Sequence, residues 1–386
     1  ADDPLMVIFT SGTTGKAKGT VHTHCGFVTK LAADFGLTGD FKADDRFLWM
    51  SDLGWLVGPM QLVVTTFFGA TLVLAEGAPD YPDSGRLWRL VADHRVTYLG
   101  VAPTIVRAMM RNGTGDVERH DLSSLRLTVS SGELWTPEAW TWFFENVCRR
   151  QAPIINISGG TEIGWGILYC TVLHPQKPCC FTTPCLGMGV EILDARGEPV
   201  ADGTQGELAL RLPSIGLTRS FWNDDTRYLE TYWSKIPGKW VHGDWASREE
   251  DGTWFLHGRS DDTIMIAGKR CGPSEVESLL LEPGLLTEAA ATAISDPIKG
   301  EALLCVCVAA PGIAADDELR GRLRGLVEAG LGPAFRPKDL LFVTELPKTR
   351  SMKVMRRVVR AIYEGRDPGD LAALANPDAI EALRRT

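Results

Sequence analysis

A glycine-rich stretch near the start of the chain combines the groups that bind phosphate. Residues 6–20 read MVIFTSGTTGKAKGT, an apolar run followed by hydroxyls, glycines and lysines. Gly12, Gly15 and Gly19 allow backbone conformations in which successive N–H groups converge on an oxyanion. Further donors and positive charge come from Thr10, Ser11, Thr13, Thr14, Lys16 and Lys18. The pattern predicts a strand that runs into a phosphate-binding loop.

The Walker loop, GxxxxGK[ST], is one alternative, but its spacing does not match. Gly12 and Gly15 are too close together, and Ala17 stands where that motif needs a magnesium-binding hydroxyl. The residues after Gly19 favour a return strand, whereas a Walker loop opens a helix. A Walker-type phosphotransferase would release ADP. A surface loop without a ligand is the other alternative.

Two polar pairs follow apolar segments that we expect to be strands of a parallel sheet. Gly132 and Glu133 follow one segment, and Thr161 and Glu162 follow the next. Ligands of such sheets collect at the carboxyl ends of the strands. The Thr161 hydroxyl suits a phosphate oxygen, and the Glu162 carboxylate suits Mg²⁺. Ordinary turns at strand ends are the structural alternative for both pairs.

The order of predicted helices and strands favours an α/β protein with two domains. Helical and strand-like segments alternate up to residue 180, which indicates a largely parallel layer. Short strands with turn signals follow, as in a small antiparallel barrel. The pattern of residues 262–386 indicates a compact α+β domain. Its first helix has capping-box spacing at Ser274 and Glu277. We expect a large domain over residues 1–260, with the α/β layer at 1–180 and the barrel at 181–258, and a small domain over residues 261–386.

Composition excludes several classes of protein. A net charge of −9 over 386 residues argues against a general nucleic-acid surface. No apolar run has the roughly 18–20 residues of a membrane span, and no signal peptide is recognisable, so we expect a cytoplasmic protein without a membrane partner. The nine cysteines form no CxxC pair, which favours reduced, mostly buried thiols. His22 and His24 are expected to alternate on a strand as core residues.

The motif TSGTTGKAKG resembles the phosphate loop of the adenylate-forming superfamily, which includes acyl-CoA synthetases, peptide-synthetase adenylation domains and luciferases. The sequence HGDW, with Asp244, resembles the ribose-binding segment of that superfamily, and the block from Gly258 to Arg270 resembles its hinge. LPKTRSMK, which ends at Lys353, resembles its catalytic-lysine motif. These motifs occur in superfamily order along nearly the whole chain.

The resemblance implies a role for each site residue. ATP and AMP would be bound by Thr10, Ser11, Gly12, Thr13, Thr14, Gly15, Lys16, Gly132, Glu133, Asp244, Arg259 and Arg270. Catalysis would use Lys353, Thr161 and Glu162, with Mg²⁺ on Glu162. Asp261 would be the hinge and Gly268 would line the CoA channel. The acyl pocket would be lined by Trp55, Leu56, Val57, Ser131 and Gly159.

The implied activity is that of an acid–CoA ligase of the acetyl-CoA synthetase type, with ATP, CoA and a small carboxylic acid as substrates. Acetyl-specific relatives have a tryptophan at the position of Gly159, so the pocket should accept an acid larger than acetate, short branched or medium-chain. Relatives also carry a long segment before the phosphate loop, so we expect this chain to be part of a longer protein. The sequence does not predict an oligomeric state.

Two departures from the superfamily pattern keep other functions open. Met352 replaces a glycine next to Lys353, and Glu328 occupies the position of an arginine that contacts the CoA phosphates. An adenylation domain that passes the acyl group to a carrier protein is the nearest alternative. A nucleotide-binding domain without turnover is the alternative from another class. Acid-dependent exchange of pyrophosphate into ATP, and release of a CoA thioester, distinguish these functions.

Overall fold

The computed structural model describes residues 1–10, 17–260, 262–266, 269–297, 300–349 and 353–386, without the side chain of Arg270. The chain divides into two compact units. The first contains Ala1–Thr10, Ala17–His242 and Ala246–Leu256. The second contains Gly243–Trp245 and the described part of His257–Thr386. Each unit has hydrophobic clusters of its own.

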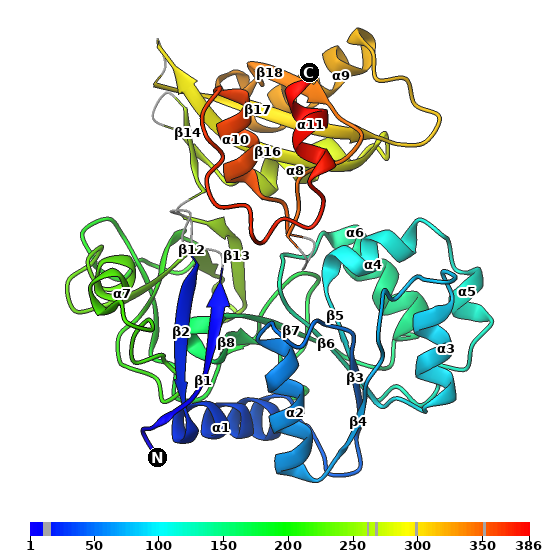
Figure 1. Cartoon of the computed structure of the whole chain (residues 1–386), viewed down its shortest axis with the longest axis vertical. Helices are drawn as coiled ribbons and strands as arrows, with labels where there is room; N and C mark the ends of the chain where they lie inside the picture. The colour runs from blue at the N-terminus through cyan, green and yellow to red at the C-terminus, as the bar shows by residue number, and fades with distance from the viewer. Residues whose placement is uncertain (11–16, 261, 267–268, 298–299, 350–352) are drawn as a thin grey trace. The chain divides into compact units, whose positions relative to one another are not determined.

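The first unit is built on a seven-stranded sheet with the order β4-β3-β5-β6-β7-β8-β9 (Figure 1). The strands are β3 (Arg46–Trp49), β4 (Thr71–Val73), β5 (Tyr98–Val101), β6 (Leu127–Ser130), β7 (Ile154–Gly160), β8 (Trp165–Tyr169) and β9 (Thr183–Pro184). Pairing is parallel from β4 to β7, and β8 and β9 are antiparallel to their neighbours. The predicted α/β class, with a parallel layer, is confirmed.

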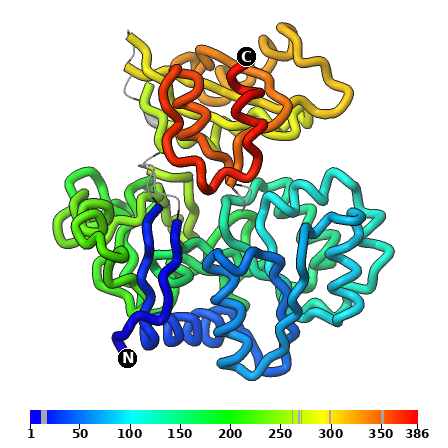
Figure 2. Tube along the Cα trace, in the orientation of Figure 1, coloured from blue at the N-terminus to red at the C-terminus, as the bar shows by residue number. Residues whose placement is uncertain are grey.

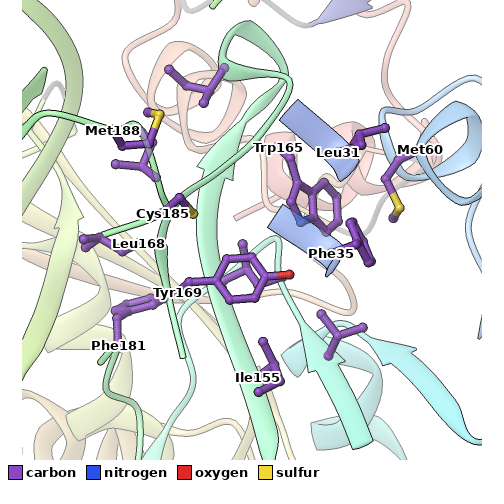
Figure 3. Close-up of a cluster of buried hydrophobic side chains, with 14 of the residues drawn as sticks. Leu31, Phe35, Met60, Ile155, Trp165, Leu168, Tyr169, Phe181, Cys185 and Met188 are labelled. Atoms are coloured by element: carbon purple, nitrogen blue, oxygen red, sulfur yellow. The ribbon is translucent and has the colours of Figure 1, made fainter. Parts of the chain in front are cut away.

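Helices cover both faces of this sheet. They are α1 (His24–Ala32), α2 (Val57–Phe68), α3 (Arg86–Asp93), α4 (Pro103–Met110), α5 (Gly115–Glu118) and α6 (Pro137–Trp142), with the π-helical turns η1 (Ala33–Thr38) and η2 (Phe143–Val147). Alternate side chains of a strand point to opposite faces. Phe47 and Trp49 accordingly pack with α1 and α2, while Leu48 packs with α3 and α6. Figure 3 shows part of the first cluster, including Phe35 and Trp165.

Two smaller groups of strands complete this part of the chain. β1 (Pro4–Thr10) and β2 (Lys18–Thr23) form an antiparallel ribbon, drawn in dark blue in Figure 2. β10 (Val190–Leu193), β11 (Gly206–Leu210), β12 (Trp240–Arg248) and β13 (Trp254–Arg259) form a four-stranded sheet in chain order, and α7 (Asp225–Tyr232) lies between β11 and β12 in sequence. β12 and β13 contribute residues to both units. Residues 181–258, where short strands were expected, therefore contain strands.

The second unit is a three-stranded sheet, β16-β17-β18, between two layers of helices (Figure 1). Its elements are β14 (Ile264–Ile266), β15 (Lys269–Cys271), α8 (Pro273–Leu281), β16 (Leu286–Asp296), β17 (Gly300–Ala309), α9 (Asp317–Leu331), η4 (Pro333–Phe335), β18 (Asp339–Phe342), α10 (Arg356–Tyr363) and α11 (Asp378–Arg384). Cys305 and Cys307 face α8 and α9, whereas Leu304 and Val306 face α10 and α11. The two cysteines share one face, as alternation predicts.

Two local predictions are wrong. His22 lies on β2, but His24 is the first residue of α1, because the Thr23 hydroxyl accepts the N–H of Gly26 at 3.1 Å and caps a helix there. The strand therefore ends one residue before His24.

The cap of α8 also differs from the prediction. Gly272 is the N-cap residue, and the carboxylate of Glu275 accepts its N–H at 2.9 Å, so the cap lies two residues before Ser274 and the helix starts at Pro273. Glu277 instead accepts the N–H of Ala291 at 2.9 Å and joins α8 to β16. The spacing was right for a capping box, but Pro273 begins the helix earlier.

All nine cysteines are free thiols, as expected. Cys25 is exposed at the start of α1, Cys179 is half-buried, and the other seven are buried. Burial raises the pKa of Cys148 and of Cys179 to about 12. A search of the described helices for one with the length and apolar character of a membrane span finds none.

Candidate active site

The strands that flank the glycine-rich stretch pair directly, with Thr10 opposite Lys18. β2 is the return strand expected after the loop, and a helix of the kind that opens a Walker motif does not follow. Thr10 is half-buried at the end of β1. The predicted phosphate-binding residues Ser11, Gly12, Thr13, Thr14, Gly15 and Lys16 lie outside the described residues. The described part of the ribbon fixes where this loop begins and ends.

One face of β2 is polar although it is buried. Lys18, Thr20 and His22 alternate along this face, and all three are at least nine-tenths buried. Burial lowers the pKa of His22 to about 4, against the opposing effects of the Glu162 carboxylate and a hydrogen bond with the backbone of Thr161. The imidazole is therefore neutral at physiological pH. A neutral ring adds no positive charge beside the carboxylate.

Glu162 is a buried carboxylate held in a defined orientation. It belongs to the single 3-10 turn Thr161–Ile163 that follows β7. The hydroxyl of Tyr232 donates to its Oε1 at 2.7 Å. The Tyr232 ring stacks on Trp240, with 4.8 Å between centroids and 16° between planes, and the ammonium of Lys18 lies 5.3 Å from its centroid. The contacts with Trp240 and Lys18 hold the ring whose hydroxyl orients the carboxylate.

This carboxylate fits a Mg²⁺ that is shared with a nucleotide. Mg²⁺ usually keeps several waters and is bound by one or two carboxylates together with substrate phosphates. Within the described ranges, no group of three or more His, Cys, Asp or Glu side chains could hold a metal ion by itself. A single oriented Glu162 is the protein contribution that such a shared ion needs.

Sequence reasoning missed Tyr232. It is separated from Glu162 by 70 residues, so no local spacing links the two. Tyr228 and Tyr232 are four residues apart on α7, and both are buried. Residues four apart lie on the same face of a helix, so this spacing was the sequence signal that two tyrosines of α7 are buried together.

β6 and β7 are parallel neighbours, paired up to Ser130 and Asn156, and β7 continues to Gly160. Gly132 has a positive φ of 103°, a conformation that favours glycine. Glu133 forms an ion pair with Arg107 at 2.7 Å and also accepts the Thr104 hydroxyl. Both partners belong to α4. The structure therefore places Glu133 and Thr161 after neighbouring strand ends at the same edge of the sheet, as predicted for a ligand-binding edge.

The residues predicted to line the acyl pocket occupy three places in the first unit. Trp55, Leu56 and Val57 lie just before or at the start of α2 and are half-buried. Leu56 and Val57 pack against the cluster shown in Figure 3. Ser131 follows β6 and is also half-buried.

The argument that Gly159 frees the volume of an aromatic side chain is wrong. A Cβ at Gly159 would lie 1.7 Å from the carbonyl oxygen of Trp165 and 2.8 Å from the Cα of Gly166, at a bulge between β7 and β8. Trp165 itself is buried, with its ring centroid 5.8 Å from that of Trp49 and 5.3 Å from that of Phe35. The glycine is required by the close approach of two strands, and any additional room must lie elsewhere.

In the second unit, the structure brings Asp244 and Arg259 together. The distance from Arg259 Nη1 to Asp244 Oδ1 is 3.6 Å. Gly243 has a φ of 87°, and a Cβ there would lie 2.7 Å from Arg259 Nη2, so the guanidinium lies against bare backbone. The N–H of Ser260 donates to the Gly243 carbonyl at 2.8 Å. A carboxylate and a guanidinium held in this way can bind the hydroxyls of a ribose.

Lys353 lies on the second strand of a short hairpin in the second unit. Lys348 and Val354 form an antiparallel bridge, the Thr349 N–H donates to the Lys353 carbonyl at 2.9 Å, and the Lys353 N–H donates to the Thr349 hydroxyl at 3.2 Å. The Lys353 side chain is exposed. Its backbone is therefore fixed while its ammonium is accessible.

Three further predicted positions are described only in part or not at all. Asp261 and Gly268 lie outside the described residues. Arg270 is on β15, opposite Met265, but its side chain is not described.

Comparison with known proteins gives a consistent result. The model of the family described as AMP-binding enzyme matches residues 1–222, and that of the AMP-binding enzyme C-terminal domain matches residues 275–353. The acetyl-coenzyme A synthetase of Gemmatimonas aurantiaca is 41% identical over all of this chain, which covers 59% of that protein. That of Pyrobaculum aerophilum is 37% identical over all of the chain, which covers 58% of it. The chain thus spans less than two thirds of these relatives.

Solved structures of two CoA ligases are also similar. Acetoacetyl-CoA synthetase from Streptomyces lividans superposes with a TM-score of 0.89 at 26% identity, over all of this chain and 59% of that one. An anthranilate CoA ligase in complex with anthranoyl-AMP gives 0.80 at 25% identity, over 96% of this chain and 68% of the other. With the family match covering more than half of the residues, the chain belongs to the AMP-binding enzyme family.

Proposed function

We propose that the protein containing this chain is an AMP-forming acid–CoA ligase. The observation that carries the proposal is the edge of the sheet where Glu133 and the Thr161–Glu162 turn follow neighbouring parallel strands, within the residues that match the AMP-binding enzyme family. The similarity to acetyl-CoA synthetases and to two other CoA ligases supports CoA as the acyl acceptor. ATP, CoA and a carboxylic acid are the proposed substrates.

In the proposed first step, a carboxylate oxygen attacks the α-phosphorus of ATP. The bond from that phosphorus to the bridging oxygen breaks, and pyrophosphate leaves with the electron pair, which gives acyl-AMP. Negative charge increases around the phosphorus, so preorganised donors and cations lower the barrier. We assign this role to the Thr161 hydroxyl and the Lys353 ammonium. Residues 10–16 would bind the leaving phosphates, and Glu133, Asp244, Arg259 and Arg270 would hold the nucleoside.

The protein side of the metal site is the oriented carboxylate. Mg²⁺, when bound, neutralises charge on the phosphates of the nucleotide. Glu162 would hold it, because Tyr232 fixes one carboxylate oxygen and leaves the group unable to rotate freely.

In the proposed second step, the CoA thiolate attacks the acyl carbon and AMP leaves, while the thiol proton passes to solvent. We propose that residues 1–260 and 261–386 act as separate domains that rearrange at Asp261 between the steps, and that Gly268 then lines the CoA channel. Glu328, which occupies an arginine position of acetyl-type relatives, is paired with Arg336 in this structure. The phosphates of CoA would therefore be bound by other residues.

We further propose that the acid is larger than acetate, either short and branched or of medium chain length. Support comes from the similarity to acetoacetyl-CoA synthetase. Since the Cβ direction of Gly159 is filled by β8, the room would have to come from the side of Trp55, Leu56, Val57 and Ser131.

The test is a panel of carboxylic acids offered with ATP to the full-length protein that contains this chain, scored by AMP release and by acid-dependent exchange of pyrophosphate into ATP. Thioester formation is then measured with CoA. Lys353→Ala should lower exchange by about a hundredfold or more, because a charge that stabilises the transition state is lost. Lys338→Ala, at an exposed lysine of the same unit that pairs with Asp296, is the matched control.

The outcomes separate the alternatives. ADP as the product, or no response to any acid, would refute the proposal. AMP release without a CoA thioester would indicate transfer to a carrier protein. Preference for acetate over every longer acid would refute the larger pocket alone.

A further inference from the structure

The chain segment after α10 returns to the hairpin that carries Lys353. Leu374 forms an antiparallel bridge with Thr349, and the N–H of Ala375 donates to the carbonyl of Lys348 at 2.8 Å. α11 then packs beside α10 (Figure 1). All these residues belong to the second unit. The hairpin thus has a third segment along its edge, contributed by the end of the chain.

Asn376 provides most of the polar contacts in this arrangement. Its Oδ1 accepts the backbone N–H of Lys348 at 2.9 Å. Its Nδ2 donates to the carbonyl of Leu346 at 2.8 Å and to the carboxylate of Glu345 at 2.7 Å. One side chain therefore fixes the backbone on both sides of Pro347, immediately before the hairpin turns.

The fixed strand in turn holds Lys353. Thr349 exchanges two hydrogen bonds with Lys353, one from its backbone N–H and one to its hydroxyl. The Lys348 ammonium also pairs with Glu288 on β16 at 2.6 Å. The position of the Lys353 backbone therefore depends on Lys348 and Thr349, and Asn376 binds the first of these directly.

We propose that Asn376 is a positioning residue for Lys353, and that the C-terminal segment around it tunes the adenylation step. The proposal rests on the function proposed above, in which the Lys353 ammonium acts on the α-phosphate. A long exposed lysine side chain reaches a productive geometry only from a fixed backbone, and small misplacements are costly to the rate. Asn376 lies beyond residue 353, where the match to the C-terminal family model ends.

The same segment has a separate apolar anchor, which makes the proposal testable by substitution. Leu371 and Leu374 pack in a cluster with Met355, Val358 and Ile380. Because these contacts do not involve the amide, Asn376→Ala removes the side-chain hydrogen bonds to residues 345–348 and leaves the apolar contacts and the backbone bond from Ala375 to Lys348 in place. Fold integrity can be checked by the thermal unfolding midpoint.

The matched control is Asp370→Ala in the same segment. Asp370 is exposed, and its Oδ1 accepts the N–H of Ala372 at 2.9 Å, away from the hairpin. In the full chain, Asn376→Ala should slow acid-dependent pyrophosphate exchange about tenfold. Thioester formation from supplied acyl-AMP and CoA should stay above about half of the unmodified rate, because Lys353 has no role in that step. Asp370→Ala should change neither half-reaction.

A second measurement does not depend on catalysis. Trypsin can cut after Lys348, Arg350 and Lys353. Cleavage after Lys348 or Lys353, identified by the masses of the products, requires local opening of the paired backbone. Asn376→Ala should be cut there faster than the unmodified chain, whereas Asp370→Ala should not. Equal losses in both half-reactions, unchanged exchange, or unchanged cleavage would overturn the proposal. If the unmodified full-length protein that contains this chain activates no acid, the proposed function fails, and the cleavage comparison still decides whether Asn376 holds the hairpin.

Discussion

At the scale of single residues, the hydroxyl of Tyr232 donates to a buried carboxylate, and hydrogen bonds to charged groups contribute about 1.5–3 kcal/mol. Tyr232→Phe should leave Glu162 free to rotate, and so weaken binding of the shared metal ion. We expect the Mg²⁺ concentration for half-maximal pyrophosphate exchange to rise about tenfold, the equivalent of about 1.4 kcal/mol. Titration of the exchange rate with Mg²⁺ checks this.

Tyr228→Phe is the control for that experiment. Tyr228 is on the same helix and is also buried, but its hydroxyl donates to the Thr218 carbonyl at 3.0 Å. Its removal should cost about 1 kcal/mol of stability and leave the Mg²⁺ dependence unchanged. An equal shift in both variants would argue against a specific role for Tyr232.

The buried imidazole of His22 should make the stability of the protein depend on pH. Its pKa falls from 6.5 to about 4 on burial, so between these values the unfolded chain binds a proton that the folded chain does not. Stability therefore falls as pH drops through this window, and by pH 5 the loss is about 2 kcal/mol. His22→Gln should lose that much less stability between pH 7.5 and pH 5 than the unmodified chain, by urea unfolding. Parallel losses would show that the imidazole does not control this slope.

At the scale of elements, alanine should have opposite effects on stability at two glycines, one at the contact of β7 with β8 and one on α9. Gly159→Ala places a Cβ against the Trp165 backbone and should destabilise the protein by about 2 kcal/mol or more, since β8 must move. Gly321→Ala, at an exposed position of α9 where an added Cβ has no neighbour within 4 Å, should stabilise it by roughly 0.5–1 kcal/mol. Denaturant midpoints measure both. A tolerated Gly159→Ala would mean that the bulge can open.

The sequence predicted elements better than it predicted their contacts. Alternating apolar segments located the parallel strands, and strand ends located Glu133 and Thr161, because periodicity and strand polarity are local properties. The bulge at Gly159 depends on how β8 pairs with β7, and the orientation of Glu162 depends on a tyrosine 70 residues away. Neither can be read from spacing. The α8 cap failed because two overlapping caps were possible and the proline selected the earlier one.

At the scale of the whole molecule, the second unit contains its own buried clusters, around Leu303, Leu304 and Val358. We propose that residues 261–386 form a domain, and a chain of residues 262–386 should then unfold in one cooperative urea transition. Far-UV circular dichroism measures the transition. A gradual, non-cooperative change would place the boundary elsewhere or require the first unit for folding.

The distribution of thiols has a practical consequence for fluorescence labelling of this chain. Seven cysteines are shielded by packing, and a raised pKa keeps Cys179 protonated, which leaves Cys25 as the exposed sulfhydryl. A maleimide dye should attach there in preference to the other sites, because it must reach the sulfur, and Cys180, whose pKa is lowered to about 7 by a hydrogen bond with Cys170, is buried. The native chain thus offers one labelling position, at the first turn of α1, for fluorescence experiments without prior removal of cysteines.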